Sequence, residues 1–563
     1  MDRRTTLAAF LGRSKKTAGS AATAAAFQPK SGALPTVLSG LEPYTGNFEY
    51  EQAAHLLRRT TFGPNYTQIK EAVSMGLDAT VKLLFEDKPA PAPPINHNFT
   101  DDPFVPIGET WIDAPYLADV NLRGYRNQSL RAWTMLNMIN ERTSVREKLV
   151  LFWHNHFVTA EINDPKFRYR NIELYREFAW GNFRELTKRV TIDPTMLRYL
   201  NGNQNTAASP NENYARELLE LFTIGKGPAA GPGDYTNYTE DDVVQIARVL
   251  TGWRDVGFVT LNPDVEVSSV FIPNRHDKGE KTLSHRFDNV VISDMGADEY
   301  AHLIDIVFQK DEVARFICRK FYRWFVYYVI TDEIEANVIE PMAQILIDND
   351  YEIRPALEAL FRSAHFYDML NVGPMIKNPL DFIMSILKQP EVALPDDPLL
   401  AYRFGWQVFR TTPLLQMEYY NPPSVAGWKA YYQEPSFYRI WINSVTLPLR
   451  QELSNLMVFE GIAQGGFRMR IDTLKFAESL DNPFDPNELI REFAAILFPQ
   501  PITESQVGFL KEILIPGLPD FEWTVEYGEY VADPTDPDKK MAVENKLKAL
   551  IGAMMSMPEF YLS

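Results

Sequence analysis

Apolar residues recur at helical spacing along most of this chain, and this periodicity sets the fold class. In each run the apolar residues lie three and four positions apart, which places them on one face of an α-helix. Such runs span residues 130–142, 145–157, 169–180, 297–328, 333–348 and 353–363. Residues typical of β-strands concentrate in one region. The sequence therefore predicts a mainly α fold, a large multi-helix orthogonal bundle with a small β-hairpin insertion near 255–295.

The length of the chain predicts one large continuous helical body with lobes, or two packed subdomains. The chain has 563 residues, more than one hydrophobic core normally serves. We expect residues 46–563 to form a single helical domain, in which 451–563 make a C-terminal helical lobe. Residues 1–45 are expected to be a leader and linker, because this stretch is rich in alanine and small polar residues.

The N-terminus contains an arginine pair that bears on the cellular location. Arg3 and Arg4 partly resemble a twin-arginine export signal. Arg13, Lys15 and Lys16 interrupt the apolar core of ~7–15 residues that such a signal needs. Two hypotheses stay open: export to the periplasm or cell envelope, which we favour, or a basic tail on a cytoplasmic protein that attaches to a partner or stays disordered.

Charge and cysteine content exclude several classes of protein. The net charge of −18 argues against a nucleic-acid partner, because phosphate binding needs clustered Lys and Arg. No uncharged apolar window reaches ~18 residues, so we expect no transmembrane span. Cys318 is the single cysteine, which excludes internal disulfides and a cysteine-rich zinc site. Its helical surroundings predict a buried, inert thiol.

Two histidines stand in the apolar run that ends at Phe157. His154 and His156 could chelate one metal ion if the chain were extended there, because positions two apart point the same way on a strand. On a helix they lie ~200° apart and cannot share an ion. A shared metal therefore requires the helix to end near Asn155. The alternative is that each imidazole packs against aromatic side chains and hydrogen-bonds a neighbouring helix.

An acidic helix is predicted at 211–225, and Glu217 is its candidate functional residue. Glu217 lies between Tyr214 and Leu218, so we expect it to be partly buried. A buried carboxylate must be paired or bound to a cation. Glu217 is therefore a candidate metal ligand and catalytic group, with a structural ion pair as the alternative.

The polar loop at 274–281 supplies a third candidate group. His276 and Asp277 could act as metal ligand and orienting group, or as base and orienting group. A solvated loop without function is the alternative. The nearby pair Glu299 and His302 matches half of a di-iron helix motif, but chance explains one such match in a chain with this many acidic residues.

Several stretches together resemble a known family. They include A-H-L-L-R-R-T-T-F-G at 54–63, F-W-H-N-H-F at 152–157, N-Y-A-R-E-L-L-E-L-F-T-I-G at 213–225, L-T-G-W-R at 250–254, H-D-K-G-E-K-T-L at 276–283, I-K-N-P-L-D-F at 376–382 and N-P-P-S-V-A-G-W at 421–428. In this order they resemble the bacterial domain of unknown function 1800 family, over nearly the whole chain past about residue 48. The resemblance implies a mostly helical, often exported protein that occurs beside a companion family of sulfatase-like proteins. It implies no activity and no catalytic residues.

Two functional hypotheses follow. In the first, a metal-assisted hydrolase of the bacterial envelope binds a divalent ion through His154, His156, Glu217 and His276. Glu217, His276 and Asp277 are then its catalytic groups. In the second, the chain is a non-catalytic scaffold or the partner of a companion exported protein. The aromatic segment 419–441 would then form its contact surface or bind a glycan by stacking, with core packing as the alternative.

Overall fold

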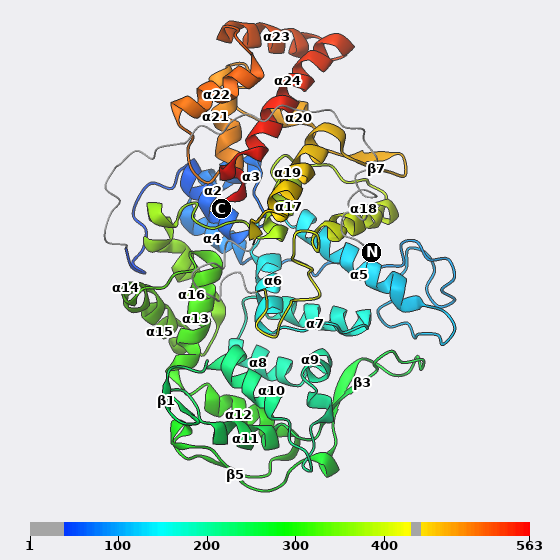
Figure 1. Ribbon diagram of the computed structural model, residues 1–563, viewed down its shortest axis with the longest axis vertical. Helices are drawn as coiled ribbons and strands as arrows, with labels where there is room; N and C mark the ends of the chain where they lie inside the picture. Colours follow the sequence, from blue (N-terminus) through cyan, green and yellow to red (C-terminus); the bar gives the residue numbers. More distant parts are fainter. Residues whose placement is uncertain (1–38, 429–440) are drawn as a thin grey trace.

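A computed structural model describes residues 39–428 and 441–563 of the chain. In these residues the mainly α fold is confirmed, with helices from distant parts of the chain lying side by side (Figure 1). The predicted leader at 1–45 falls almost entirely on residues 1–38, which lie outside the described part. None of the helices in the described ranges combines the length and the apolar character that a membrane crossing needs.

The first half of the described chain contains ten α-helices before the β insertion. They are α2 (Tyr50–Thr60), α3 (Tyr66–Met75), α4 (Leu77–Leu84), α5 (Leu122–Asn140), α6 (Arg146–His156), α7 (Pro165–Glu177), α8 (Phe183–Thr191), α9 (Pro194–Tyr199), α10 (Glu212–Glu217) and α11 (Glu240–Val249). Side-chain oxygens of Asn65, Asp164 and Asn182 accept hydrogen bonds from the first turns of α3, α7 and α8. Such caps satisfy backbone donors that have no partner inside a helix.

The second half follows the same construction. Its helices are α12 (Glu299–Val307), α13 (Asp311–Phe325), α14 (Asp332–Ile334), α15 (Glu340–Asp348), α16 (Ile353–Arg362), α17 (Pro379–Lys388), α18 (Pro398–Thr411), α19 (Thr446–Asn455), α20 (Thr473–Glu478), α21 (Pro486–Leu497), α22 (Glu504–Leu514), α23 (Asp520–Ala532) and α24 (Pro537–Ser556). Proline opens α17, α18, α21 and α24. Its fixed φ suits the first helical position, where no N–H partner is needed.

The strands form small antiparallel pairs, and the predicted β insertion contains two of them. β3 (Trp253–Val256) pairs with β4 (Ser268–Phe271), and β5 (Lys281–Thr282) pairs with β6 (Val291–Ile292). Two further pairs lie outside the predicted region. They are β1 (Ala229–Gly231) with β2 (Asp234–Tyr235), and β7 (Ile462–Gln464) with β8 (Phe467–Met469).

Helix α6 lies inside the core rather than on its surface. All of its residues from Glu147 to His156 are buried, so this helix has no solvent face, as expected for a helix surrounded by others. Trp153 is fully buried and donates its indole N–H to the carbonyl of Ala179 at 2.9 Å. Any polar side chain on α6 must therefore find its partner inside the protein.

The end of the chain returns to the body of the molecule. Helices α21 to α24 extend away at the top of Figure 1, and the C-terminus lies beside α2. There the backbone N–H of Ser563 donates to Met375 and that of Lys377 donates to Tyr561, both at 2.8 Å. This return places residues 375–381 and Ser563 next to each other. The boundary at 451 for a C-terminal lobe stays a prediction.

We expect Cys318 to resist thiol reagents in the folded protein. Its side chain is fully buried on α13, and burial raises the pKa of the thiol well above its usual value. Because only the exposed thiolate attacks, native protein should react at least ~100-fold more slowly than protein unfolded in guanidinium. Absorbance of a released aromatic thiolate measures both rates. Equal rates in the two states would contradict a buried thiol.

Candidate functional site

The two predicted histidine ligands on α6 lie in different surroundings. The helix continues through His156, so the two imidazoles point to different sides, as helical geometry requires. The ring of His154 stacks on the ring of Tyr419, with centroids 4.8 Å apart. Nε2 of His154 also forms a hydrogen bond with the backbone carbonyl of Tyr419. Burial lowers the pKa of His154 to about 4, so the ring is neutral at pH 7.

His156 is held by partners that leave no nitrogen for a metal ion. Its Nε2 lies 3.0 Å from the carbonyl of Phe222, which only accepts, so this nitrogen carries the proton. Its Nδ1 accepts a hydrogen bond from Nζ of Lys320 at 2.9 Å. Burial and the charge of Lys320 lower the pKa of His156 well below its usual value. The environment of His156 therefore agrees with the alternative to metal binding, in which the imidazole forms hydrogen bonds to neighbouring helices.

Glu217 and Asp277 also have separate environments. Glu217 is half-buried on α10, and partial burial together with the charge of Glu220 raises its pKa. Asp277 accepts hydrogen bonds from Nε and Nη2 of Arg248 at 2.7 and 3.1 Å. This pairing holds the pKa of Asp277 below its usual range. Arg248, rather than His276, is thus the partner of this carboxylate.

His276 does meet carboxylates, but not the predicted ones. Its Nε2 lies 3.1 Å from Oε2 of Glu299 and 3.7 Å from Oδ1 of Asp294. Burial lowers the pKa of His276, while hydrogen bonds to Glu299 and Thr251 raise it, and the net shift is upward.

The structure does not bring the four predicted metal ligands together. Among residues 39–428 and 441–563, one group of three or more potential ligands has its atoms within 4.8 Å of one another, and it consists of His276, Asp294 and Glu299. Of the four predicted ligands His154, His156, Glu217 and His276, this group contains His276 alone. Helical geometry separates the first two, and the packing of α10 leaves Glu217 elsewhere.

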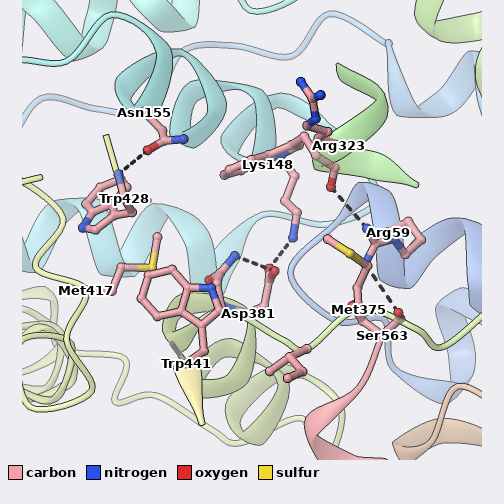
Figure 2. A pocket seen from close by; sticks show the side chains of 13 residues that line it. Arg59, Lys148, Asn155, Arg323, Met375, Asp381, Met417, Trp428, Trp441 and Ser563 are labelled. Atoms are coloured by element: carbon pink, nitrogen blue, oxygen red, sulfur yellow. Dashed lines mark hydrogen bonds and ion pairs between the residues drawn. The ribbon is translucent and has the colours of Figure 1, made fainter. Parts of the chain in front are cut away.

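A different site emerges from the packing of distant segments. A pocket is lined by side chains from α2, α6, α13, the segment 375–381 and the end of the chain, including Arg59, Lys148, Asn155, Asp381, Trp428 and Trp441 (Figure 2). Its empty volume is about 600 Å³ including the opening to solvent. The cavity itself has a volume of only about 50 Å³, so the pocket is narrow. A small chemical group fits inside.

The pocket draws on the stretches that carry the family resemblance. Arg59 lies in the stretch 54–63, Asn155 in 152–157, Asp381 in 376–382 and Trp428 in 421–428. Four stretches far apart in the sequence thus each contribute a residue to the lining of the pocket. The sequence did not predict this site, because the predicted ligands were chosen around histidines. The available signal was Lys148, a charged residue directly before the apolar run 149–153.

An ion pair closes one side of the pocket. Nζ of Lys148 contacts Oδ1 of Asp381, and Figure 2 shows the two side chains pointing toward each other. Oδ2 of Asp381 accepts a hydrogen bond from Asn378 at 2.8 Å. Burial lowers the pKa of Lys148, and Asp381 opposes that shift without cancelling it. The carboxylate therefore does not fully compensate the buried ammonium group.

Arg59 adds a second buried cation, which within the described residues forms no ion pair with an Asp or Glu side chain and also donates to the main-chain oxygen of Ser563 at 3.5 Å. Its guanidinium donates to the carbonyls of Phe325 and Trp324 at 2.9 and 3.2 Å and to Oγ of Ser563 at 2.7 Å. Arg59 is only 5% exposed, and burial lowers its pKa to about 10. Carbonyl dipoles hold this guanidinium in place without neutralising its charge.

Two more buried cations surround the same carboxylate. Burial and the neighbouring charges of Arg58, Arg450 and Lys148 lower the pKa of Lys377 well below its usual value, while Asp381 opposes the shift. Burial also lowers the pKa of Arg450 to about 10. The charge of Asp381 thus opposes the pKa shift of four buried cationic side chains, Arg59, Lys148, Lys377 and Arg450, of which Lys148 contacts it directly. The region around the pocket carries an excess of positive charge.

Asn155 presents a hydrogen-bond donor at the pocket wall. Its Oδ1 accepts from the backbone N–H of Trp428 at 2.8 Å, as drawn in Figure 2. Its Nδ2 is buried and has no hydrogen-bond partner within the described residues. Asn155 is 1% exposed. A buried donor without a partner costs about 1–3 kcal/mol, which an acceptor in the pocket would recover.

Comparisons with known proteins give a family and no activity. A family model described as "Protein of unknown function (DUF1800)" matches residues 55–562. Searches of curated proteins and of solved structures found no match. The match covers nearly the whole chain, as the sequence resemblance predicts.

Proposed function

The chain belongs to the DUF1800 family, whose function is unknown, and we propose that its pocket binds the anionic group of a small ligand. The anion lies between Lys148 and Asn155, within the field of Arg59. The rest of the ligand contacts Trp428 and Trp441, which also line the pocket. The chemical class is an oxyanion, a carboxylate, phosphate or sulfate group.

The observation that carries this proposal is the excess of buried positive charge around Asp381. An unpaired buried charge is costly, and proteins normally pair it or bind a counter-ion. Burial lowers the pKa of Arg59, Lys148 and Lys377, as expected for cations removed from water. An anion in the pocket would offset part of this desolvation cost.

The donors at the pocket wall suit an oxyanion. Lys148 carries three N–H donors and uses one on Asp381, and Asn155 has a free Nδ2 group. Hydrogen bonds to a charged acceptor contribute about 1.5–3 kcal/mol each. The narrow volume admits the head group and keeps a larger body near the tryptophans. The pocket thus selects the head group of the ligand by its negative charge, and the rest of the ligand by its shape.

Replacing Lys148 with Met should weaken oxyanion binding at least ~10-fold, because one charge-assisted hydrogen bond is lost. Replacing Asp381 with Asn should do the opposite and strengthen binding about tenfold, because a carboxylate repels a bound anion. Sulfate, phosphate and acetate serve as probes at fixed ionic strength, with chloride as reference. Thermal unfolding reports the affinity, since a ligand at 100 Kd adds ~2.7 kcal/mol of stability.

The matched control is Lys70→Met. Lys70 pairs with Asp481 at 2.7 Å, and both side chains are about half exposed or more, so its loss should leave the probe affinities unchanged. Two results would count against the proposal. One is stabilisation by the probes that is equal in wild type and Lys148→Met. The other is weaker binding of the anionic probes to Asp381→Asn, because removal of a repelling carboxylate should strengthen an anion site.

Three of the functional predictions from the sequence remain proposals. Hydrolysis, placement in the bacterial envelope and a sulfatase-like companion are proposals that rest on the motifs and the family resemblance. The scaffold alternative depends on the aromatic segment 419–441. Tyr419, Tyr420, Trp428 and Trp441 are buried in the core, and residues 429–440 lie outside the described part. The described aromatics therefore favour core packing over a contact surface.

A further inference from the structure

We propose that His276, Asp294 and Glu299 form a binding site for a divalent transition-metal ion, separate from the oxyanion pocket. The β insertion supplies the first two residues, one in the loop before β5 and one just after β6, and Glu299 opens α12. The site uses one predicted ligand, His276, with two partners that only the fold reveals.

The distances between the three side chains match those between ligands of one metal ion. Nε2 of His276 lies 3.1 Å from Oε2 of Glu299 and 3.7 Å from Oδ1 of Asp294. Nitrogen and oxygen ligands lie ~2.0–2.2 Å from zinc, so neighbouring ligand atoms around it are roughly 3.0–3.5 Å apart. The side chains need only a small rotation to close on an ion.

The tautomer of His276 independently points to a cation between these groups. Nδ1 lies 2.9 Å from the backbone carbonyl of Thr251. A carbonyl only accepts, so Nδ1 carries the proton. In the neutral ring the lone pair of Nε2 then faces Oε2 of Glu299, and two acceptors at 3.1 Å repel each other. A metal ion, or a proton carried by Nε2 or by Oε2, must lie between them.

The hydrogen bond from Nδ1 of His276 to the carbonyl of Thr251 is also typical of histidines that bind metal ions. A ligating imidazole usually donates its other N–H to a carbonyl or carboxylate, which fixes the ring orientation. His276 is buried and Glu299 is fully buried, so both are held rigidly. The ammonium group of Lys281, 2.6 Å from Oε1 of Glu299, fixes the other carboxylate oxygen. Oε2 thus remains oriented toward His276.

The ligand set and the exposure of Asp294 indicate the type of metal. One imidazole and two carboxylates suit zinc or manganese and disfavour Ca²⁺ and Mg²⁺, which take oxygen ligands. Three protein ligands leave a coordination position open. The Asp294 side chain is 39% exposed, so that position can reach solvent. A water there would be activated for hydrolysis.

The test uses the full-length protein after removal of metals with a chelator. Calorimetric titration with ZnCl₂ should give one site per chain, and Asp294→Asn should weaken that site at least 10-fold. This substitution keeps the shape of an exposed side chain, so the fold is retained. The control is Asp288→Asn, whose side chain is 78% exposed and pairs with Lys310, and which should bind zinc like wild type.

A second readout separates a metal ion from a proton. Co²⁺ in place of zinc should give visible absorption bands, and ¹⁵N spectra should show Nε2 of His276 shift on addition of zinc. Absence of a stoichiometric site, or equal zinc affinity in Asp294→Asn, would overturn the proposal. So would a doubly protonated His276 ring that zinc leaves unchanged. None of these readouts involves Lys148 or the oxyanion probes, so this proposal and the proposed function fail independently.

Discussion

Replacement of Arg176 with Met is expected to lower the free energy of unfolding by about 3–5 kcal/mol, the cost of breaking a buried ion pair on one side. Arg176 on α7 donates Nε and Nη2 to Oε1 of Glu147 on α6, at 2.9 and 2.7 Å. Its guanidinium also lies over the ring of Trp133, 4.9 Å from the centroid. Both members of the pair are almost fully buried. Without Arg176, the carboxylate of Glu147 stays inside the core without compensation.

Urea unfolding followed by circular dichroism measures this loss. The control is Arg189→Met, because Arg189 and Glu177 form a pair at 3.5 Å in which both side chains are more than half exposed. Exposed pairs contribute about 0–1 kcal/mol. Combining Arg176→Met with Glu147→Gln should restore part of the stability, because the second change removes the stranded charge. Equal losses for Arg176→Met and Arg189→Met would refute the buried-pair account.

Replacement of Gly427 with Ala is expected to damage both the fold and the pocket. Gly427 has φ +85°, where a side chain is strained. A Cβ atom there would lie 2.7 Å from the carbonyl oxygen of Asn155, a distance that forces movement. We expect a stability loss of about 3 kcal/mol, combining left-handed backbone strain and overpacking. Asn155 must move, so sulfate affinity should fall at least ~10-fold.

A second glycine isolates the steric part of this effect. Gly466 has φ +82°, and nothing lies within 4 Å of the position that its Cβ would take. Gly466→Ala therefore carries the same backbone strain without a collision, and should cost about 1 kcal/mol with unchanged sulfate affinity. Urea unfolding and probe-induced thermal shifts measure both variants. If the two alanine variants behaved alike, close packing of Gly427 on Asn155 would have no functional importance.

The elements that depend on local interactions were predictable from the sequence. Apolar spacing predicted α6 within one residue at each end, and the predicted β insertion near 255–295 contains β4. The family resemblance covers the same residues that the family model matches, up to 562. These features follow from contacts a few residues apart in the chain, which the sequence displays directly.

The candidate pocket depended on contacts that no local pattern displays. Lys148 and Asp381 are 233 positions apart, and Asn155 and Trp428 are 273 apart. Their proximity results from the way whole helices pack. Histidine spacing was misleading for the same reason, since His154 and His156 found partners in Tyr419 and Lys320 rather than in each other.

By itself, the sequence determined the helical class, the position of the β insertion and the family, because periodicity and motif order are properties of neighbouring residues. Only the tertiary structure decided which charged residues are buried, which of them share a pocket, and that His276 meets Asp294 and Glu299. The physical reason is that burial and proximity arise from the packing of complementary helix surfaces, and the cost of an uncompensated charge exists only after that packing has removed water.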